Sequence, residues 1–219
     1  AHIALVFPGQ GAQAPGMGSA LYETSAAARE VFDRVETLRP GTQHQCFEGT
    51  AEELTRTVNT QPCLWAVETA CAAALAEAGV RAEAAAGFSL GEITALGYSG
   101  AADFDTAFRL VCRRAELMDE AAGEADAAMA AVLKLTDERV ESLCLGFEHV
   151  WPVNYNCPGQ VTVSGLSDEL DEFIREVKLS GGVAKRLKVS GAFHSPLMEG
   201  AARRFAPELE GAELISPER

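Results

Sequence analysis

The chain has 219 residues, of which 47% are hydrophobic and 23% are charged, as is usual for a globular protein of one domain or two small ones. A formal net charge of -14 argues against general binding to nucleic acid or to an anionic membrane. Six scattered cysteines, with no C-x-x-C pair, predict reduced thiols, no metal site and a cytoplasmic location.

The first predicted element is a buried strand over 1–7, which is too short for a signal peptide or a membrane span. A glycine-rich loop over 8–18 follows and leads into a helical pattern, so its N–H groups are expected at a helix N-terminus. The loop lacks the spacing of a phosphate-binding motif. Further on, an amphipathic helix is predicted to end at Gly79 from apolar residues three and four apart: Leu64, Val67, Cys71 and Leu75.

A serine then stands between a predicted strand and a predicted helix. Ala84–Phe88 is a small apolar run, Ile93–Leu96 is typical of a helix, and Ser89 lies between them, flanked by Gly87 and Gly91. Glycines at these two positions suit a sharp turn, because Cβ atoms there would clash when the chain reverses. The pattern Gly-x-Ser-x-Gly is that of a nucleophile elbow. Taken alone, it is also compatible with an ordinary turn or a helix cap.

The second half of the chain predicts the order βαββαβ, that of a ferredoxin-like subdomain. We therefore expect an α/β fold in which an α/β-hydrolase-like domain (1–125) is interrupted by this subdomain (126–190) and resumes over 191–219. The alanine-rich stretch 121–131 is a candidate hinge. The predicted strands and helices are, in order, Ala127–Leu135, Glu138–Leu145, His149–Asn154, Gln160–Ser164, Glu169–Val177 and Gly182–Val189.

A serine hydroxyl becomes a good nucleophile only when a base takes its proton, and histidine is the usual base. The chain has four histidines: His2, His44, His149 and His194. His194 follows a Ser-Gly-Ala break where the chain is expected to re-enter the larger domain, and Pro196 indicates that a helix starts just after it. His194 is therefore the candidate base, with a solvated or structural histidine as the alternative.

A charged residue lies on the apolar side of the helix predicted from Phe104 to Met118. At about 100° per residue, Arg114 points between two apolar groups, whereas Arg113 points to solvent. A guanidinium in such a place needs a carboxylate partner because it stays charged. That partner is either an acidic residue of the chain or the carboxylate of a substrate held bidentately.

Taken together, these motifs resemble the malonyl-CoA:acyl carrier protein transacylases and the acyltransferase domains of polyketide and fatty acid synthases. The resemblance runs from Phe7 to about Met198 and so covers most of the chain. It rests on six motifs in the expected order: Phe7–Gln13, Thr60-Gln61-Pro62, Gly87–Glu92, Arg109–Arg114, Asn154–Val161 and Ala192–Ser195.

The resemblance implies a role for each candidate residue. Ser89 would attack the thioester of malonyl-CoA after His194 removes its proton, forming an acyl-enzyme. Backbone N–H groups of Gln10 and Leu90 would hold the oxyanion. The phosphopantetheine thiol of acyl carrier protein would then take the acyl group, with His194 as acid and then base.

The resemblance also implies how the substrate is selected. Arg114 would bind the malonyl carboxylate, and Phe193 is similar to the residue found before the histidine in malonyl-selective domains. The partners are a coenzyme A thioester and acyl carrier protein, with no nucleic acid or membrane, and no bound cofactor is implied. The sequence leaves three properties open: tolerance of methylmalonyl groups, the oligomeric state, and the choice between a freestanding enzyme and a synthase domain.

The sequence departs from the family pattern in two places. Phe88 stands where many members carry histidine, and the chain ends at Arg219 soon after the histidine loop. Family members continue through strands that supply a backbone carbonyl to orient the histidine. We therefore expect the C-terminal part to be missing, which leaves the activity of this piece open.

Two other classes of function fit parts of the pattern. A serine hydrolase or thioesterase would use the same elbow, with Asp168 or Asp171 completing its triad. A non-catalytic fragment that docks on an acidic carrier protein would use the basic run of Lys185, Arg186 and Lys188, which is otherwise an exposed strand edge.

Overall fold

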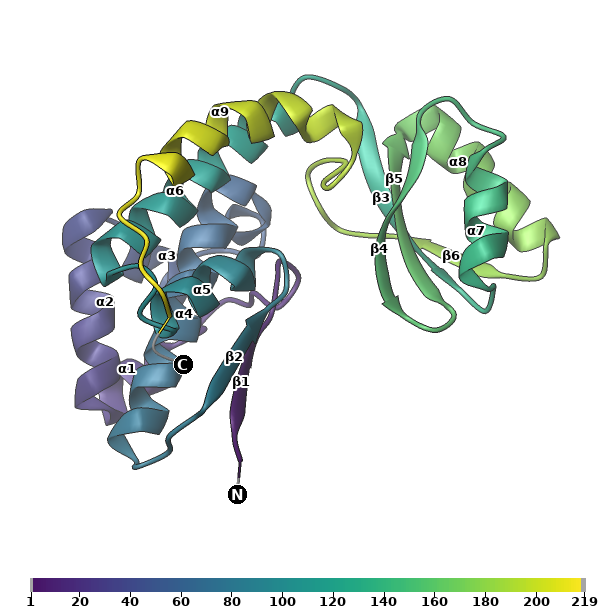
Figure 1. Ribbon diagram of the computed structural model, residues 1–219. Coiled ribbons are helices and arrows are strands. Elements are labelled where there is room, and N and C mark those ends of the chain that lie inside the picture. The colour runs from purple at the N-terminus through teal and green to yellow at the C-terminus, as the bar shows by residue number, and fades with distance from the viewer. Residues whose placement is uncertain (1, 218–219) are drawn as a thin grey trace. The chain divides into compact units, whose positions relative to one another are not determined.

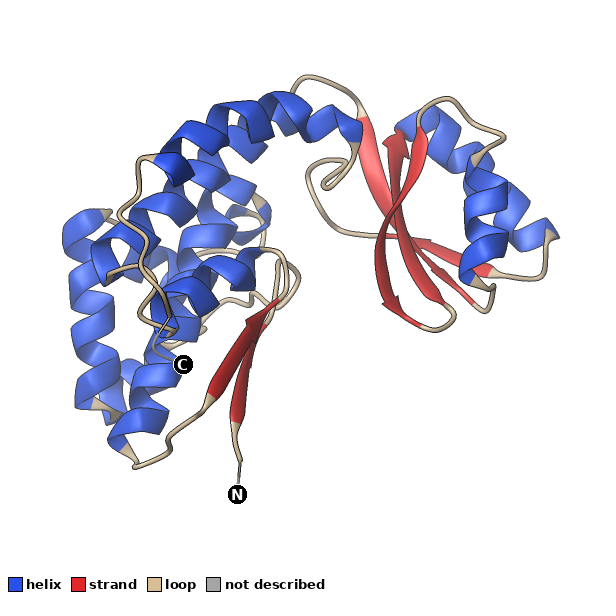
Figure 2. Cartoon of the chain, viewed as in Figure 1, coloured by secondary structure: helices blue, strands red, loops and turns tan. Residues whose placement is uncertain are grey.

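The computed structural model describes residues 2–217, so Ala1 of the predicted first strand and residues 218–219 lie outside it. The chain divides into two compact units, Ala1–Glu116 with Phe205–Arg219, and Leu117–Arg204. Both boundaries fall inside helices, α6 (Phe104–Ala122) and α9 (Glu199–Glu210). Figures 1 and 2 show a first unit that is mostly helical and a second built on a larger sheet.

The first unit pairs a short parallel sheet with a group of helices. Strands β1 (Ala4–Phe7) and β2 (Ala84–Gly87) pair in register from Ala4–Ala84 to Phe7–Gly87. Helix α5 (Leu90–Tyr98) follows β2 directly and packs against both strands. The other elements of this unit are α1 (Ser19–Thr24), α2 (Ala26–Leu38), α3 (Thr42–Glu48), the 3-10 helix η1 (Glu53–Thr55), α4 (Thr57–Glu77), α5 (Leu90–Tyr98) and most of α6.

Helix α4 lies at the centre of this unit, and every residue from Thr60 to Ala66 is buried. The predicted end is confirmed, since α4 stops just before Gly79, whose φ of 86° is left-handed. Of the predicted amphipathic stripe, Leu64 is buried and Val67 and Cys71 are partly buried, but Leu75 is 41% exposed. A helix surrounded by neighbours buries residues on all sides, so no single face marks it in the sequence.

The prediction of a buried first strand is also wrong in its burial. Strand β1 forms where expected, but only Phe7 is buried and Val6 is 73% exposed. In residues 2–217, β1 pairs with β2 alone in this sheet. An apolar run indicates burial only when protein covers both faces of its strand.

The second unit has the predicted order βαββαβ. Its antiparallel sheet has the strand order β4-β5-β3-β6, which makes β6 an edge strand. Val161, Val163 and Phe173 are fully buried between the sheet and its two helices. The elements are β3 (Ala127–Leu133), α7 (Asp137–Cys144), β4 (Val150–Cys157), β5 (Gln160–Leu166), α8 (Ser167–Leu179), β6 (Val183–Arg186), η2 (Pro196–Met198) and the start of α9.

The boundaries between the units differ from those predicted at 125/126 and 190/191. Residues 117–125 and 191–204 group with the second sheet, so His194 belongs to the second unit and not to the first. One reason is a contact between segments far apart in the sequence: a Cβ on Gly191 would lie 2.6 Å from the Cβ of Ala122, so the last turn of α6 touches the loop after β6. The candidate hinge 121–131 lies partly in α6 and partly in β3.

Within the described residues, no helix is both long and apolar enough to cross a membrane.

Candidate active site

Ser89 occupies the predicted turn between β2 and α5 in a strained conformation. Its φ of 54° and ψ of -103° lie in a region that favours glycine. Such a conformation costs about 1–3 kcal/mol and is found most often at functional sites. The hydroxyl thus stands at the head of α5, as in a nucleophile elbow.

Both glycines of the elbow are required by close backbone contacts. A Cβ on Gly87 would lie 2.1 Å from the carbonyl carbon of Gly91, and one on Gly91 would lie 2.2 Å from the carbonyl oxygen of Phe7. Both distances are shorter than any real Cβ contact, and backbone atoms yield little. The steric reason given for the Gly-x-Ser-x-Gly spacing is confirmed.

Gly91→Ala should therefore lower the free energy of unfolding by about 3 kcal/mol or more, because the added methyl overlaps backbone. Urea unfolding measures this directly. The matched control is Gly97→Ala on the same helix, where the new Cβ would meet side chains and not backbone: the Ala107 methyl at 3.1 Å and the Trp65 ring at 3.7 Å. We expect the control to change stability by less than about 1 kcal/mol. Equal effects of the two variants would contradict this account of the elbow.

The Ser89 hydroxyl is hydrogen-bonded to the candidate arginine. The Arg114 Nη2 donates to Ser89 Oγ at 3.1 Å, and Nη1 donates to Gln61 Oε1 at 2.9 Å. Burial lowers the pKa of Arg114 from its usual value, while the negative charge of Glu92 acts in the opposite direction. The guanidinium still stays protonated at neutral pH.

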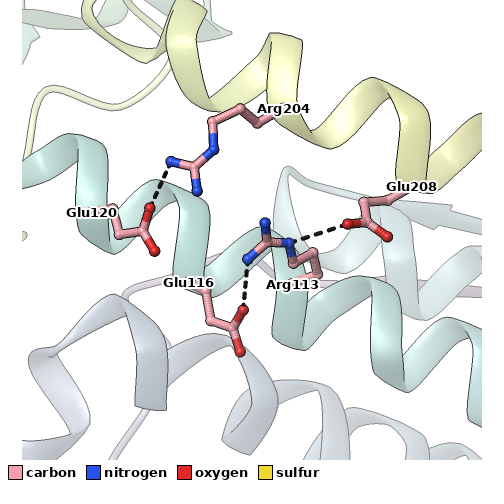
Figure 3. Close-up of polar contacts among 5 residues, drawn as sticks. All are labelled: Arg113, Glu116, Glu120, Arg204 and Glu208. Carbon is pink, nitrogen blue, oxygen red and sulfur yellow. Dashed lines mark hydrogen bonds and ion pairs between the residues drawn. The ribbon is translucent and has the colours of Figure 1, made fainter.

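The two neighbouring arginines of α6 differ in their partners. Arg113 lies at the surface and contacts Glu116 at 3.0 Å and Glu208 at 3.2 Å (Figure 3). Arg114 is half-buried and has no carboxylate within ion-pair distance among residues 2–217. The two alternatives for its partner were an acidic residue of the chain and the carboxylate of a substrate. The first is thus not found in the described part of the chain.

The predicted apolar stripe of α6 explains where Arg114 points. Its central members are buried and Phe104 is partly buried, so the helix presents this face to the core. The buried members are Phe108, Leu110, Val111, Ala115, Leu117 and Met118.

The glycine-rich loop reaches the elbow through both backbone and side chains. A Cβ on Gly9 would lie 2.9 Å from the carbonyl oxygen of Phe88, so the two segments touch. The Gln61 Nε2 donates to Gln10 Oε1 at 3.0 Å. Leu90 begins α5, and its N–H is one of the first-turn donors that have no acceptor within a helix. Gln10, Leu90, Ser89 and Arg114 are therefore gathered in the first unit.

The His194 loop is held within the second unit by two serines. His194 is exposed and has a φ of 62°, and Phe193 before it is buried. Ser164 Oγ on β5 donates to the Phe193 carbonyl at 2.7 Å. Ser195 Oγ donates to the Ala192 carbonyl at 2.6 Å and accepts from the Leu197 N–H. The helix start predicted at Pro196 is confirmed by η2.

The other histidines lie beside carboxylates at the surface. His2 contacts Glu83 at 2.7 Å and His44 contacts Glu48 at 3.6 Å. His149 contacts Glu169 at 2.6 Å, and this hydrogen bond raises the pKa of His149. Among the described residues, no group of three or more His, Cys, Asp or Glu side chains is arranged to hold a metal ion.

Sequence reasoning alone does not find two residues of this region. Gln61 enters it only as part of a family marker, and Ser164 only as part of a strand. Both are fully buried polar residues in the fold. The sequence signals for them are the family marker for Gln61 and, for Ser164, a hydroxyl next to Val163 in a predicted strand.

Comparison with known proteins identifies the family. Residues 4–217 match the acyl transferase domain family. The malonyl CoA-acyl carrier protein transacylase of Bacillus subtilis is 40% identical, with 97% of this chain and 69% of that protein covered. The corresponding enzyme structure from Coxiella burnetii is 34% identical with a TM-score of 0.94, covering 99% of this chain and 71% of that one.

A further solved structure shows a type II polyketide synthase acyl carrier protein in complex with its malonyl-transacylase. It is 35% identical to this chain with a TM-score of 0.94, and covers 100% of this chain and 72% of that one. The resemblance inferred from the six ordered motifs is thus confirmed. The chain belongs to the acyl transferase domain family.

Proposed function

We propose that this chain is a malonyl-CoA:acyl carrier protein transacylase that works through an acyl-enzyme on Ser89. One observation supports this most strongly: a half-buried cation without a carboxylate partner in residues 2–217, Arg114, donates a hydrogen bond to a serine on a strained elbow. A hydrolase acting on neutral esters has no use for such a cation. An enzyme that transfers malonyl groups does need such a cation, because the free carboxylate of the malonyl group can pair with the guanidinium.

The proposed reaction has two symmetrical halves. His194 accepts the Ser89 proton while Oγ attacks the thioester carbonyl, and the C–S bond then breaks as His194 returns the proton to the departing coenzyme A thiolate. In the second half the phosphopantetheine thiol gives its proton to His194 and attacks the ester, and Ser89 leaves with that proton. Backbone N–H groups of Gln10 and Leu90 hold the oxyanion in both halves.

Selectivity is proposed to come from Arg114 and Phe193. Arg114 recognises the malonyl carboxylate, whereas Phe193 is assigned by its resemblance to malonyl-selective domains. Side chains and backbone amides suffice for this chemistry, so we propose no bound cofactor and take malonyl-CoA as a substrate. The predicted cytoplasmic location stays a prediction.

We also propose a finer description of the fold. The second unit has the βαββαβ order and the strand order β4-β5-β3-β6, which support a ferredoxin-like subdomain. The strand-elbow-helix of the first unit supports an α/β-hydrolase-like domain into which that subdomain is inserted.

Mass spectrometry of the chain after mixing with malonyl-CoA tests the function. A malonyl ester that peptide mapping places on Ser89, and that moves to the thiol of added holo acyl carrier protein, would support the proposal. Release of free malonate without transfer would favour a hydrolase instead. Binding of the carrier protein without any covalent adduct would favour a docking fragment, for which the exposed Lys185 and Lys188 are the candidate contacts.

A further inference from the structure

The motif Thr60-Gln61-Pro62 has no role in the reaction as described, yet it lies in the buried centre of α4. Pro62 stands six residues into the helix and lacks the N–H that would bond to the Val58 carbonyl. The Arg39 Nη2 donates to that carbonyl at 3.3 Å in its place. The helix thus continues past Pro62, and Gln61 is fixed on its inner face with a fully buried side chain.

The side-chain amide of Gln61 bridges two parts of the site. Its Oε1 accepts from Arg114 Nη1 at 2.9 Å, and its Nε2 donates to Gln10 Oε1 at 3.0 Å. Gln10 in turn directs its Nε2 toward Thr57 Oγ1 at 3.5 Å. The carboxylate-binding cation and the oxyanion loop are therefore joined through one side chain.

The direction of this network follows from the chemistry of arginine. A guanidinium can only donate, so the amide that meets it must present oxygen. The amide nitrogen of Gln61 then necessarily faces Gln10, which must present its own oxygen. One donor-only group, Arg114, thus sets the orientation of both glutamine side chains.

We propose that Gln61 is a positioning residue. Its two hydrogen bonds orient Arg114 toward the acyl carboxylate and restrain the Gln10 loop at the same time. This inference rests on the proposed malonyl transfer. Arg114 can pair only with acyl groups that carry a carboxylate, whereas the Gln10 loop acts on all of them. Loss of Gln61 must therefore harm malonyl transfer more than acetyl transfer.

Gln61→Met tests this, because methionine keeps the length and volume but neither accepts nor donates as an amide does. We expect kcat/KM for malonyl-CoA to fall about 30-fold or more and that for acetyl-CoA by only a few fold. The matched control is Gln45→Met. Gln45 also accepts from an arginine, Arg39 at 2.7 Å, and donates to another amide, Asn59 at 3.1 Å, but does so away from Ser89. Equal losses for the two acyl groups in Gln61→Met would overturn the inference.

A double-mutant cycle separates positioning from simple destabilisation. With Arg114→Ala already present, Gln61→Met should lower malonyl transfer by no more than it lowers acetyl transfer, since nothing is left to aim. If the full malonyl loss from Gln61→Met persists without Arg114, Gln61 does not act through the arginine.

Gln61→Glu supplies a second test that does not depend on a cavity. The carboxylate introduced by this substitution would pair with Arg114, repel a malonyl carboxylate and have no proton to give Gln10; protonation restores a donor. The malonyl-to-acetyl rate ratio of this variant should therefore rise as the pH falls, relative to the unaltered chain. A pH profile of the ratio like that of the unaltered chain would contradict the inference. If neither the unaltered chain nor a form extended by the expected C-terminal part forms a malonyl ester, the proposed function fails and this inference with it, whereas equal acyl losses would reject the inference alone.

Discussion

Ser89→Ala should abolish the malonyl adduct and lower transfer to acyl carrier protein by several orders of magnitude. The physical reason is that the variant retains the elbow and Arg114 but has no oxygen to form the ester. Intact-protein mass spectrometry with peptide mapping measures it. The matched control is Ser99→Ala, at the other end of α5, where the hydroxyl donates to the Leu96 carbonyl and accepts from the Ala101 N–H, and the adduct should form as before.

The same position also tests the strain at the elbow. Alanine keeps the cost of φ 54°, whereas glycine tolerates this conformation. We therefore expect Ser89→Gly to be more stable than Ser89→Ala by about 1 kcal/mol in urea unfolding, although glycine gains entropy in the unfolded chain. A malonyl adduct on Ser89→Ala would show that another residue is the nucleophile. Equal stability of the two variants would show that the turn is not strained.

The elbow could be predicted because its pattern is local, with Gly87 and Gly91 two residues before and after Ser89. Only one of the two contacts behind it is local, since a Cβ on Gly87 would meet Gly91 in the helix that follows, whereas a Cβ on Gly91 would meet Phe7 at the end of β1. The βαββαβ order could be predicted for a similar reason. Its strands alternate with amphipathic helices, and Pro158-Gly159 marks the turn between β4 and β5, where Gly159 has a φ of 78°.

Features set by distant packing could not be read in this way. The sequence around Val6 is as apolar as that of a buried strand, but its exposure depends on what lies across the sheet. The first half of helix α4 is surrounded and has no single apolar face, whereas its last residues, Leu75 among them, are exposed, so the predicted stripe fails there. The boundary inside α6 depends on the contact between Ala122 and Gly191, which no local pattern reveals.

The candidate site likewise has one part that the sequence predicts and one part that it does not. Arg114 could be placed by helical period, because its angle relative to Val111 and Leu117 is fixed within one helix. Its bonds to Gln61 and Ser89 span 53 and 25 residues, and spacing does not predict these. The network through Gln61 is thus visible only in the folded chain.

Arg114→Ala should lower the rate of malonyl transfer about 100-fold or more. The rate of acetyl transfer should fall much less in the same variant. A guanidinium can give a carboxylate two charge-assisted hydrogen bonds, each contributing about 1.5–3 kcal/mol, and an acetyl group makes neither. Arg114→Lys keeps the charge but not the planar fork, so its rate of malonyl transfer should lie between that of the unaltered chain and that of Arg114→Ala. Steady-state kcat/KM values for malonyl-CoA and acetyl-CoA measure both variants.

Arg113→Ala is the matched control for this prediction, since it removes the neighbouring guanidinium from the exposed side of the same helix. Its bonds to Glu116 and Glu208 are surface ion pairs, which contribute about 1 kcal/mol or less, so neither stability nor the acyl preference should change much. Arg114→Ala, by contrast, leaves Gln61 Oε1 without the donor that orients it. Some loss of acetyl transfer is therefore expected as well, but losses of equal size for both acyl groups would show that Arg114 does not bind the carboxylate.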